Sequence, residues 1–273
     1  MIVDFHTHIF PPEMIASREA LAARDVTFAE MYRDRRARMA TAQDLLRSMD
    51  AAGIDVSVAL GFAWSDMEDC RRHNDYLLEE AARSRGRILA FCCLAPEADG
   101  PTVAAEVRRV AAGGARGLGE LRSTCGLRSP EGADALGSTG LVPLFHVSEP
   151  VGHHYPGKSG VPLDAMVEAA SSLPAPLVAA HWGGGLPFFT LMPEVRVALE
   201  GAYFDTAASR FLYAADVYRR VIDLVGADRV LFGSDFPLVA QEAARREAES
   251  AGLPASGLAL VLGGNAARLL GLT

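Results

Sequence analysis

The chain has 273 residues, a formal net charge of −8 and a hydrophobic content of 50%. This composition is typical of a globular protein with a large core, and it excludes a disordered, collagen-like or coiled-coil chain. The negative charge argues against nucleic acid or an anionic membrane as a partner, because both carry negative charge themselves.

The first residues include an acid, Asp4, and have no basic stretch ahead of an apolar run, so we expect no signal peptide. No apolar run approaches the roughly 18 residues that a membrane-spanning helix needs. The four cysteines form no CxxC motif, and their scatter indicates reduced thiols rather than a disulfide framework. We therefore expect a cytoplasmic protein. The cysteines are Cys70, Cys92, Cys93 and Cys125.

Short β-branched or apolar runs recur along the chain, and each is followed by a stretch with helical periodicity. This alternation predicts βαβ units and a parallel sheet. The repeat of roughly 33 residues matches the length of a βαβ crossover. We predict an α/β fold, a single (β/α)8 TIM barrel in one domain over residues 1–273. The predicted strands are 2–8, 56–62, 88–94, 115–122, 142–148, 176–181, 202–206 and 230–235.

Two stretches interrupt the rhythm, and we expect them to be loop insertions at about 9–40 and 149–161. Loops that follow barrel strands lie on the catalytic face, so both are candidates for lids or specificity loops. The predicted helices lie between the strands. They span 41–53, 103–112, 163–170, 214–225, 240–250 and 266–270.

The first predicted strand ends in Asp-Phe-His-Thr-His, which places His6 and His8 two residues apart. Side chains at i and i+2 of a strand point to the same face, so both imidazoles can reach one ion. An isolated H-x-H is weak evidence, because it also occurs in sites without metal. The positions of the other histidines strengthen it.

Three further candidate ligands also lie where predicted strands end: His146, His181 and Asp235. The strand ends of a closed barrel meet at one mouth, so residues far apart in sequence become neighbours there. Several imidazoles and a carboxylate suit a divalent transition metal, and zinc is the usual ion for hydrolysis. We predict a metal site at the C-terminal ends of the strands.

Glu120 ends the fourth predicted strand and has two readings. It is either an acid paired with an arginine such as Arg122, or a carboxylate that bridges two metal ions. A carbamylated lysine cannot serve as the bridge at a strand end, because the only lysine is Lys158, in the loop after strand five. If two metals bind, Glu120 is the predicted bridge.

Four residues are candidates for holding a polar or acidic part of a substrate: Arg122, His154, Tyr155 and Lys158. The last three lie in the 149–161 loop, where the alternative reading is turn chemistry shaped by glycine and proline. His73 follows two arginines, and its surroundings predict an exposed position. Asp205, at the end of strand seven, is a candidate hydrogen-bond partner for a metal-bound histidine.

An ordered set of motifs resembles the amidohydrolase superfamily, specifically the amidohydrolase-related branch that includes aminocarboxymuconate-semialdehyde decarboxylase. The resemblance extends over essentially the whole chain and implies a (β/α)8 barrel. The motifs are Val-Asp-Phe-His-Thr-His, Phe-His-Val-Ser-Glu-Pro, Ala-His-Trp-Gly-Gly-Gly-Leu-Pro, Phe-Asp-Thr-Ala-Ala, Leu-Phe-Gly-Ser-Asp-Phe-Pro and Gly-Gly-Asn-Ala-Ala-Arg-Leu-Leu.

The resemblance implies that His6, His8, His146 and Asp235 bind a divalent metal, usually zinc. It also implies that His181 contacts the metal-bound water or the substrate, and that Asp235 accepts and returns a proton. Glu120 departs from the pattern of the decarboxylases in this branch, which generally use one metal. Related hydrolases with two metals carry such a glutamate, so Glu120 favours hydrolysis.

The main functional prediction is therefore metal-dependent hydrolysis of a C–N or C–O bond in a small molecule, such as an amide, cyclic amide, ester or lactone. The alternative is metal-dependent, non-oxidative decarboxylation of an unsaturated or aromatic acid. A barrel that binds without turnover is the third and least favoured reading. The sequence leaves open whether the ion number is one or two and whether the chain forms a homo-oligomer.

Overall fold

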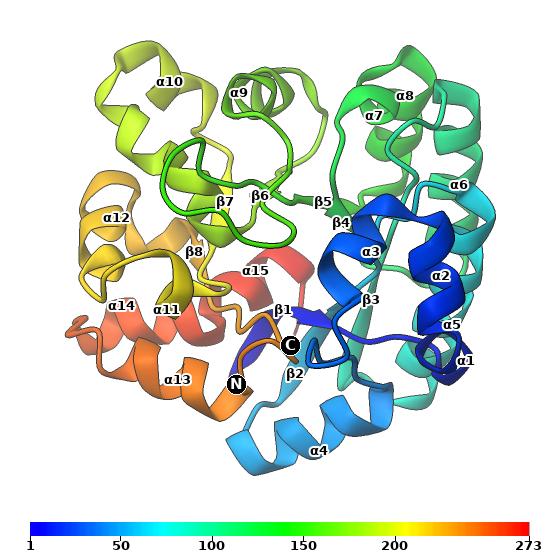
Figure 1. Ribbon diagram of the computed structural model, residues 1–273. Helices are drawn as coiled ribbons and strands as arrows, with labels where there is room; N and C mark the ends of the chain where they lie inside the picture. Colours follow the sequence, from blue (N-terminus) through cyan, green and yellow to red (C-terminus); the bar gives the residue numbers. More distant parts are fainter. Residues whose placement is uncertain (273) are drawn as a thin grey trace.

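The structure is a computed structural model that describes residues 1–272, and its strands confirm the predicted (β/α)8 barrel. Eight parallel strands pair in sequence order, from the first to the last. The strands lie at the centre of the molecule (Figure 1). They are β1 (Val3–His8), β2 (Val56–Leu60), β3 (Ile88–Cys92), β4 (Gly117–Leu121), β5 (Val142–Phe145), β6 (Val178–Ala179), β7 (Tyr203–Asp205) and β8 (Val230–Leu231).

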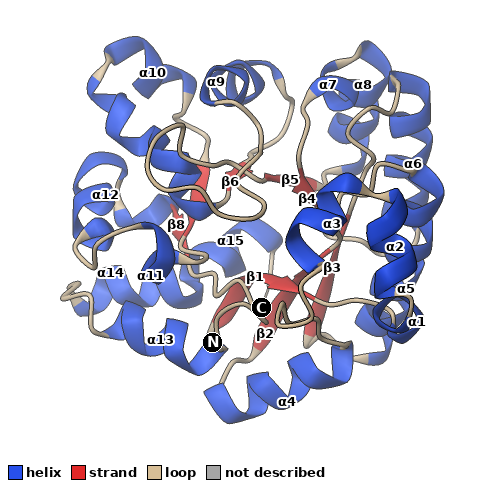
Figure 2. Ribbon diagram, in the orientation of Figure 1, coloured by secondary structure: helices blue, strands red, loops and turns tan. Residues whose placement is uncertain are grey.

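Helices surround the strands as an outer layer (Figure 2). Their bounds are α1 (Pro12–Ala16), α2 (Arg18–Arg24), α3 (Val26–Tyr32), α4 (Ala42–Ala52), α5 (Met67–Arg83), α6 (Gly100–Ala112), α7 (Cys125–Arg128), α8 (Pro130–Thr139), α9 (Leu163–Ser172), α10 (Pro193–Ala198), α11 (Ser209–Leu212), α12 (Val217–Val225), α13 (Gln241–Glu249), α14 (Ala255–Ala259) and α15 (Asn265–Leu270). Three further helical segments are η1 (His181–Leu191), η2 (Ala227–Arg229) and η3 (Leu260–Gly264).

The first crossover helix shows how local sequence sets an element. Thr41 and Asp44 form a capping box at the start of α4, with each side chain accepting a hydrogen bond from the other residue's backbone N–H. Gly53 ends the helix in the left-handed conformation, at φ +64°. Leu45 and Met49 are fully buried on the inner face. The predicted start and end of this helix are therefore confirmed.

The barrel interior is apolar below its mouth. Side chains from most of the strands form one buried cluster, in which the Phe5 and Phe91 rings meet edge to face at 5.5 Å. Ala266 and Leu270 of α15 belong to the same cluster and help to close the bottom of the barrel. The polar side chains of the barrel mouth lie at the opposite end, where the strands finish.

Two strands each contain one extra residue close to that mouth. The β1–β2 register shifts between Asp4 and Thr7, and the β4–β5 register shifts between Leu118 and Leu121. A β-bulge of this kind changes the direction in which the following side chains point. Val3 and Phe5 point into the apolar interior, so the shift in β1 allows His6 and His8 to face inward as well.

The 9–40 segment is not a simple loop, because it contains the three helices α1, α2 and α3. Its aromatic side chains pack with Phe62 and Trp64 in a separate buried cluster. The prediction that His73 is exposed is wrong. Its ring is fully buried against Phe10, donates to the Ile9 carbonyl oxygen at 2.7 Å, and accepts from the Trp64 indole N–H.

Cys70, Cys92 and Cys93 are buried free thiols, and the side chain of Cys125 lies outside the part of the structure that is described. Among the described residues, none of the helices combines the length and apolar character that a membrane crossing requires.

Backbone and buried side-chain bonds connect the first strand to the last. The Phe5 N–H donates to Phe232 O at 2.7 Å, and the Asp235 N–H donates to His6 O at 2.9 Å. Asp4 is fully buried and accepts hydrogen bonds from the Ser234 hydroxyl at 2.6 Å and from the Gln241 amide at 2.8 Å. This network closes the barrel directly beside Asp235.

Replacing Ser234 with alanine should lower the free energy of unfolding by about 1–3 kcal/mol. The change removes the hydroxyl donor to Asp4 and the hydroxyl oxygen that accepts from the Phe236 N–H. Asp4 keeps its bonds from the Gln241 amide and from backbone N–H groups but loses one buried hydrogen bond, and the Phe236 N–H loses this acceptor. Urea unfolding followed by circular dichroism measures the difference. Ser171→Ala, on the exposed side of α9, is the matched control. Equal stability of the two variants would show that the network contributes nothing.

Candidate active site

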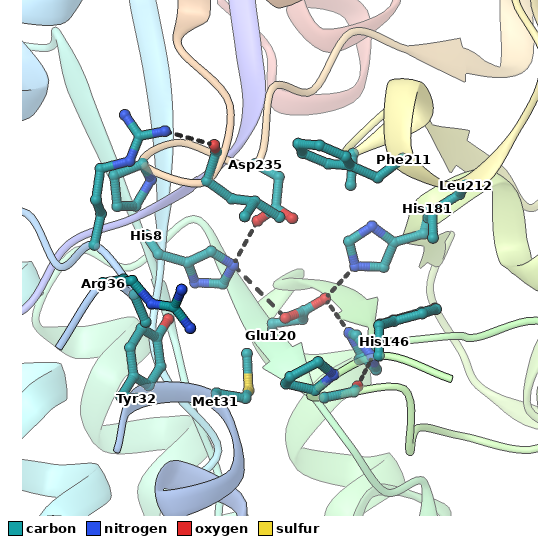
Figure 3. A pocket seen from close by; sticks show the side chains of 18 of the residues that line it. His8, Met31, Tyr32, Arg36, Glu120, His146, His181, Phe211, Leu212 and Asp235 are labelled. Atoms are coloured by element: carbon teal, nitrogen blue, oxygen red, sulfur yellow. Dashed lines mark hydrogen bonds and ion pairs between the residues drawn. The ribbon is translucent and has the colours of Figure 1, made fainter. Parts of the chain in front are cut away.

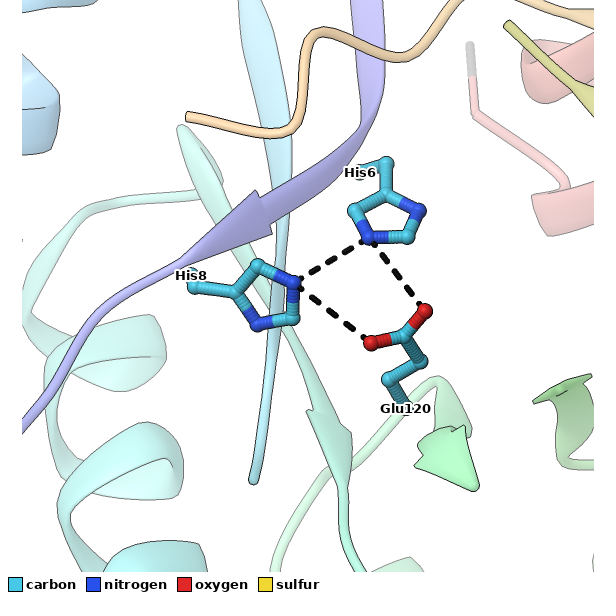
Figure 4. Close-up of side chains that lie close together, drawn as sticks. All are labelled: His6, His8 and Glu120. Atoms are coloured by element: carbon cyan, nitrogen blue, oxygen red, sulfur yellow. Dashed lines mark hydrogen bonds and ion pairs between the residues drawn. The ribbon is translucent and has the colours of Figure 1, made fainter. Parts of the chain in front are cut away.

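Six polar side chains meet at the C-terminal mouth of the barrel. His6 and His8 lie on β1 and Glu120 on β4. His146 directly follows β5, His181 begins η1 after β6, and Asp235 lies in the segment after β8. Figure 3 shows five of the six facing a common space, and Figure 4 shows the sixth, His6, beside His8 and Glu120. The structure thus brings together the residues that the sequence singled out as metal ligands: His6, His8, Glu120, His146, His181 and Asp235.

The first group of close atoms lies around the two histidines of β1. The Nε2 atoms of His6 and His8 are 3.1 Å apart, and both face the carboxylate of Glu120 at 3.7 Å (Figure 4). Asp235 Oδ1 lies 3.4 Å from His8 Nε2 and 3.7 Å from His6 Nε2. Two imidazole nitrogens and two carboxylates therefore surround one small volume.

The second group shares Glu120. Its Oε1 atom lies 2.8 Å from His146 Nδ1 and 3.2 Å from His181 Nε2. Glu120 therefore belongs to both groups, with one oxygen 3.7 Å from His8 and the other close to His146 and His181.

Gly233 allows the segment after β8 to lie close to β1, because a Cβ atom at that position would lie 2.8 Å from the Cβ of His6.

Each imidazole has an inner ring nitrogen, which faces the centre of the site, and an outer one, which faces away from it. In three histidines, the outer nitrogen lies beside an oxygen that can only accept a hydrogen bond. Asp205 Oδ2 accepts from His6 Nδ1 at 2.8 Å, Gly157 O accepts from His146 Nε2 at 2.9 Å, and Ala207 O lies 3.2 Å from His181 Nδ1. An outer nitrogen that donates carries the proton of the neutral ring, so the inner nitrogen presents a lone pair. Asp205 thus has the supporting position that was predicted.

In the absence of a metal ion, a protonated histidine balances the buried carboxylates of the site. Burial alone would raise the pKa of Glu120, but the neighbouring histidines His146 and His6 outweigh burial and hold it well below its usual value. Burial opposes the charged form of His6 too, yet Asp205 and Glu120 raise its pKa to about 10. Burial and the nearby Arg122 lower the pKa of His146 to about 4.

These residues fit a divalent metal ion. When the imidazoles are neutral, their lone pairs and the ionised carboxylates face one another in a buried space. Such a set of acceptors needs a positive charge, which a proton on His6 supplies in the absence of a metal and a metal ion supplies when it binds. Nitrogen and oxygen ligands of this type suit zinc, manganese, iron, nickel or cobalt. The arrangement can hold a cation and place an anionic substrate beside Asp235 and His181.

A cavity of about 560 Å³ opens above these side chains (Figure 3). Its floor is polar, and its walls are largely apolar side chains from the 9–40 segment, α11 and the segment after β8. A small organic molecule is the kind of ligand that such a cavity accommodates. The apolar wall residues are Met31, Ala37, Pro156, Ala208, Phe211, Leu212, Pro237 and Leu238.

The four predicted substrate-binding residues are placed differently from one another. Tyr155 lines the cavity, whereas His154 is exposed and does not. Lys158 Nζ donates to two carbonyl oxygens of its own loop, at Val151 and His153. Arg122 donates to carbonyl oxygens of the same loop. Lys158 and Arg122 therefore hold the 149–161 loop in place, and a direct contact of either residue with substrate stays a prediction.

The sequence analysis missed several cavity residues. Tyr32, Arg36 and Arg38 come from the 9–40 segment, which was predicted only as a lid or specificity loop. Residues 33–38 follow α3 as turns and bends. These residues could have been predicted from the position of the segment directly after the H-x-H strand, because a loop at that position reaches the barrel mouth.

The sequence model of one family, described as amidohydrolase, matches residues 3–272. A comparison with curated proteins finds no match. Among solved structures, 5-carboxyvanillate decarboxylase from Sphingomonas paucimobilis has a TM-score of 0.81 and 19% sequence identity, covering 100% of this chain and 99% of its own.

Two other solved structures are similar over the same extent. 2,6-Dihydroxybenzoate decarboxylase from Rhizobium has a TM-score of 0.75 and 20% identity, covering 99% of this chain and 98% of its own. The third is 5-carboxyvanillate decarboxylase from Novosphingobium aromaticivorans, in complex with manganese and 4-hydroxy-3-methoxy-5-nitrobenzoic acid. It has a TM-score of 0.79 and 15% identity, covering 100% of this chain and 96% of its own.

These comparisons correct the main functional prediction. Hydrolysis of an amide, ester or lactone was preferred because Glu120 occupies strand four. The three similar structures are decarboxylases of aromatic acids, which contradicts the preference for hydrolysis and favours its alternative, decarboxylation. A glutamate at the end of β4 is therefore not sufficient to identify a hydrolase.

Asp205→Asn should weaken divalent metal binding about 10- to 100-fold. Asp205 Oδ1 accepts from the backbone N–H groups of His181 and Ala207, so an asparagine would keep its oxygen there and present its NH2 group to His6. His6 would then have to protonate its inner nitrogen and lose the lone pair. Titration calorimetry with MnCl2 or ZnCl2 measures the affinity. The exposed Asp223→Asn is the control, and equal affinities would contradict the role of Asp205.

The Glu120→Gln variant should contain less metal per chain than the unmodified protein, because the Glu120 carboxylate belongs to both groups of ligand atoms. Elemental analysis after purification without chelators gives the content, with the exposed Glu97→Gln as the control. A fall from near two ions to one would identify a bridging carboxylate. Unchanged content in Glu120→Gln would exclude Glu120 as a ligand.

Proposed function

The chain belongs to the amidohydrolase family, and from that premise we propose that it is a metal-dependent, non-oxidative decarboxylase of an aromatic carboxylic acid. The observation that carries the proposal is the cavity itself. Its floor is a buried cluster of histidines and carboxylates, and its walls include Phe211, Leu212 and Leu238. The solved decarboxylases that resemble the chain over its full length support the same reaction.

We propose that a divalent metal is held by residues among His6, His8, Glu120, His146, His181 and Asp235. When bound, the ion supplies positive charge that attracts a substrate carboxylate and stabilises the electron pair that decarboxylation leaves behind. Manganese is the first ion to test, since two similar decarboxylase structures contain it. Zinc was the prediction from sequence. We propose either one ion or two, with Glu120 as the bridge in the second case.

In this reaction the bond between the ring carbon and the carboxylate breaks, and carbon dioxide leaves. The electron pair of the broken bond stays on the ring carbon, which then takes a proton, so an aromatic carboxylate and a proton yield an arene and carbon dioxide. Asp235 and His181 both line the cavity at its polar floor. Among the polar groups of the floor, we assign to these two the role of holding the proton and delivering it to carbon.

The walls orient the substrate. A planar ring fits against the apolar side chains of the cavity, which include Phe211, Leu212 and Leu238, and burial of these apolar surfaces favours binding. Tyr155 and His153 add polar contacts from the 149–161 loop. With the ring held there, the carboxyl group faces the histidines, where water is largely excluded and electrostatic interactions are strong.

The proposal predicts release of carbon dioxide from at least one member of a panel of hydroxylated and methoxylated benzoic acids. The assay uses protein loaded with MnCl2 or ZnCl2, measures carbon dioxide directly, and identifies the arene by mass spectrometry. Treatment with a chelator should abolish the activity, and Asp235→Asn should reduce kcat at least about 100-fold with the fold intact.

Asp223→Asn, on the exposed face of α12, is the control for the carboxylate-to-amide change. Full activity of Asp235→Asn would remove Asp235 from the mechanism. Cleavage of amides, esters or lactones together with an inert acid panel would overturn the proposed reaction.

A further inference from the structure

Tyr32 is a buried side chain with an unused polar end. Its ring is 8% exposed and packs against Phe10 at 5.3 Å, Phe28 at 5.0 Å and Phe62 at 6.0 Å between ring centres. Tyr32 also lines the cavity, on the wall facing His8 and Glu120 (Figure 3). Within residues 1–272, its hydroxyl makes no hydrogen bond to another side chain or to the backbone, and the oxygen is not among the fully buried polar atoms without a partner. The packing therefore holds one hydroxyl open to the cavity, where a ligand can reach it.

The Tyr32 hydroxyl is a neutral donor. Burial raises the pKa of the phenol, and the negative charges of Asp235 and Glu120 raise it further, well above its usual value. The group therefore keeps its proton at every ordinary pH. A protonated phenol beside a polar cavity offers an O–H for donation.

The same wall offers further donors. Arg36 and Arg38 line the cavity from the segment that follows α3. A guanidinium group has five N–H donors and no acceptor. Arg36 bonds to Asp34 and Arg38 donates to Leu238 O at 3.2 Å, which leaves both with further N–H groups. The polar side chains of this wall can therefore donate hydrogen bonds to oxygen atoms of a ligand. The two guanidinium groups cannot accept a hydrogen bond from it.

We propose that Tyr32 is a specificity-determining residue that donates a hydrogen bond to an oxygen substituent on the ring of the aromatic acid. The inference rests on the proposed function, because it assumes that an aromatic acid binds in this cavity. It adds that the preferred acid carries a hydroxyl, phenolate or alkoxy oxygen that faces α3. An acid without such an oxygen covers the hydroxyl without pairing it and binds more weakly.

The rigidity of the aromatic cluster strengthens this role. A donor that is already held by packing loses little conformational freedom when the ligand arrives, so more of the hydrogen-bond energy contributes to selectivity. The same packing makes Tyr32→Phe a clean variant. The phenylalanine ring keeps its contacts with Phe10, Phe28 and Phe62 and lacks only the oxygen.

The experiment compares binding of benzoate with binding of 2-, 3- and 4-hydroxybenzoate and their methoxy counterparts by titration calorimetry on the Mn²⁺-loaded protein. We expect the unmodified protein to bind at least one oxygenated acid more tightly than benzoate. Tyr32→Phe should weaken that acid about 3- to 10-fold and leave benzoate unchanged. Melting temperatures of both proteins confirm that the fold is retained.

Tyr76→Phe is the matched control, because Tyr76 OH accepts from the Ala42 N–H at 2.9 Å and is not among the residues lining the cavity. It should keep the selectivity of the unmodified protein. Unchanged selectivity in Tyr32→Phe would overturn the inference. An equal loss for benzoate would also overturn it, because Tyr32 would then contact the carboxylate common to all the acids.

The experiments distinguish failure of this inference from failure of the proposed function. If selective binding is lost in Tyr32→Phe while no acid releases carbon dioxide, the role of Tyr32 stands and decarboxylation does not. If no aromatic acid binds the unmodified protein, both ideas fall.

Discussion

The arrangement of the site depends on one buried carboxylate surrounded by imidazoles. Glu120 contacts His146 and His181 directly and lies within 3.7 Å of His6 and His8. A negative charge in a buried space must be compensated by a proton on a histidine or by a metal ion, because neutral histidines direct only lone pairs toward it. The hydrogen bond from His6 to Asp205 and the backbone partners of the other rings keep those lone pairs directed at the space where an ion would bind. They orient the ligand atoms before any ion arrives.

The same carboxylate explains why function was harder to predict than fold. A strand-four glutamate beside histidines is compatible with two-metal hydrolysis, and the residues themselves do not distinguish that chemistry from decarboxylation. The difference lies in what binds above the metal ligands. Leu238 and Phe211, which line the cavity, are ordinary apolar residues in sequence, and their shared wall exists only after the barrel has closed.

The segment after the first strand links the site to selectivity. Its helices bury Phe28 and Tyr32 in an aromatic cluster next to the barrel mouth, and Glu30 accepts a hydrogen bond from the Gly157 N–H of the second insertion. Gly157 O in turn accepts from His146. The two insertions therefore meet above the ligand atoms, and the wall that contacts a substrate is tied to a residue that would hold the metal.

Hydrophobic periodicity and the H-x-H motif were enough to predict the barrel, its eight strands and the six side chains at its mouth, because parallel strand ends converge wherever a βαβ series closes. Local sequence could not predict the extra residues in β1 and β4, which depend on pairing with β2 and β5. It also placed His73 on the surface, since burial in an aromatic cluster depends on partners such as Phe10 that lie far away in sequence. Long-range packing alone decided which side chains line the cavity.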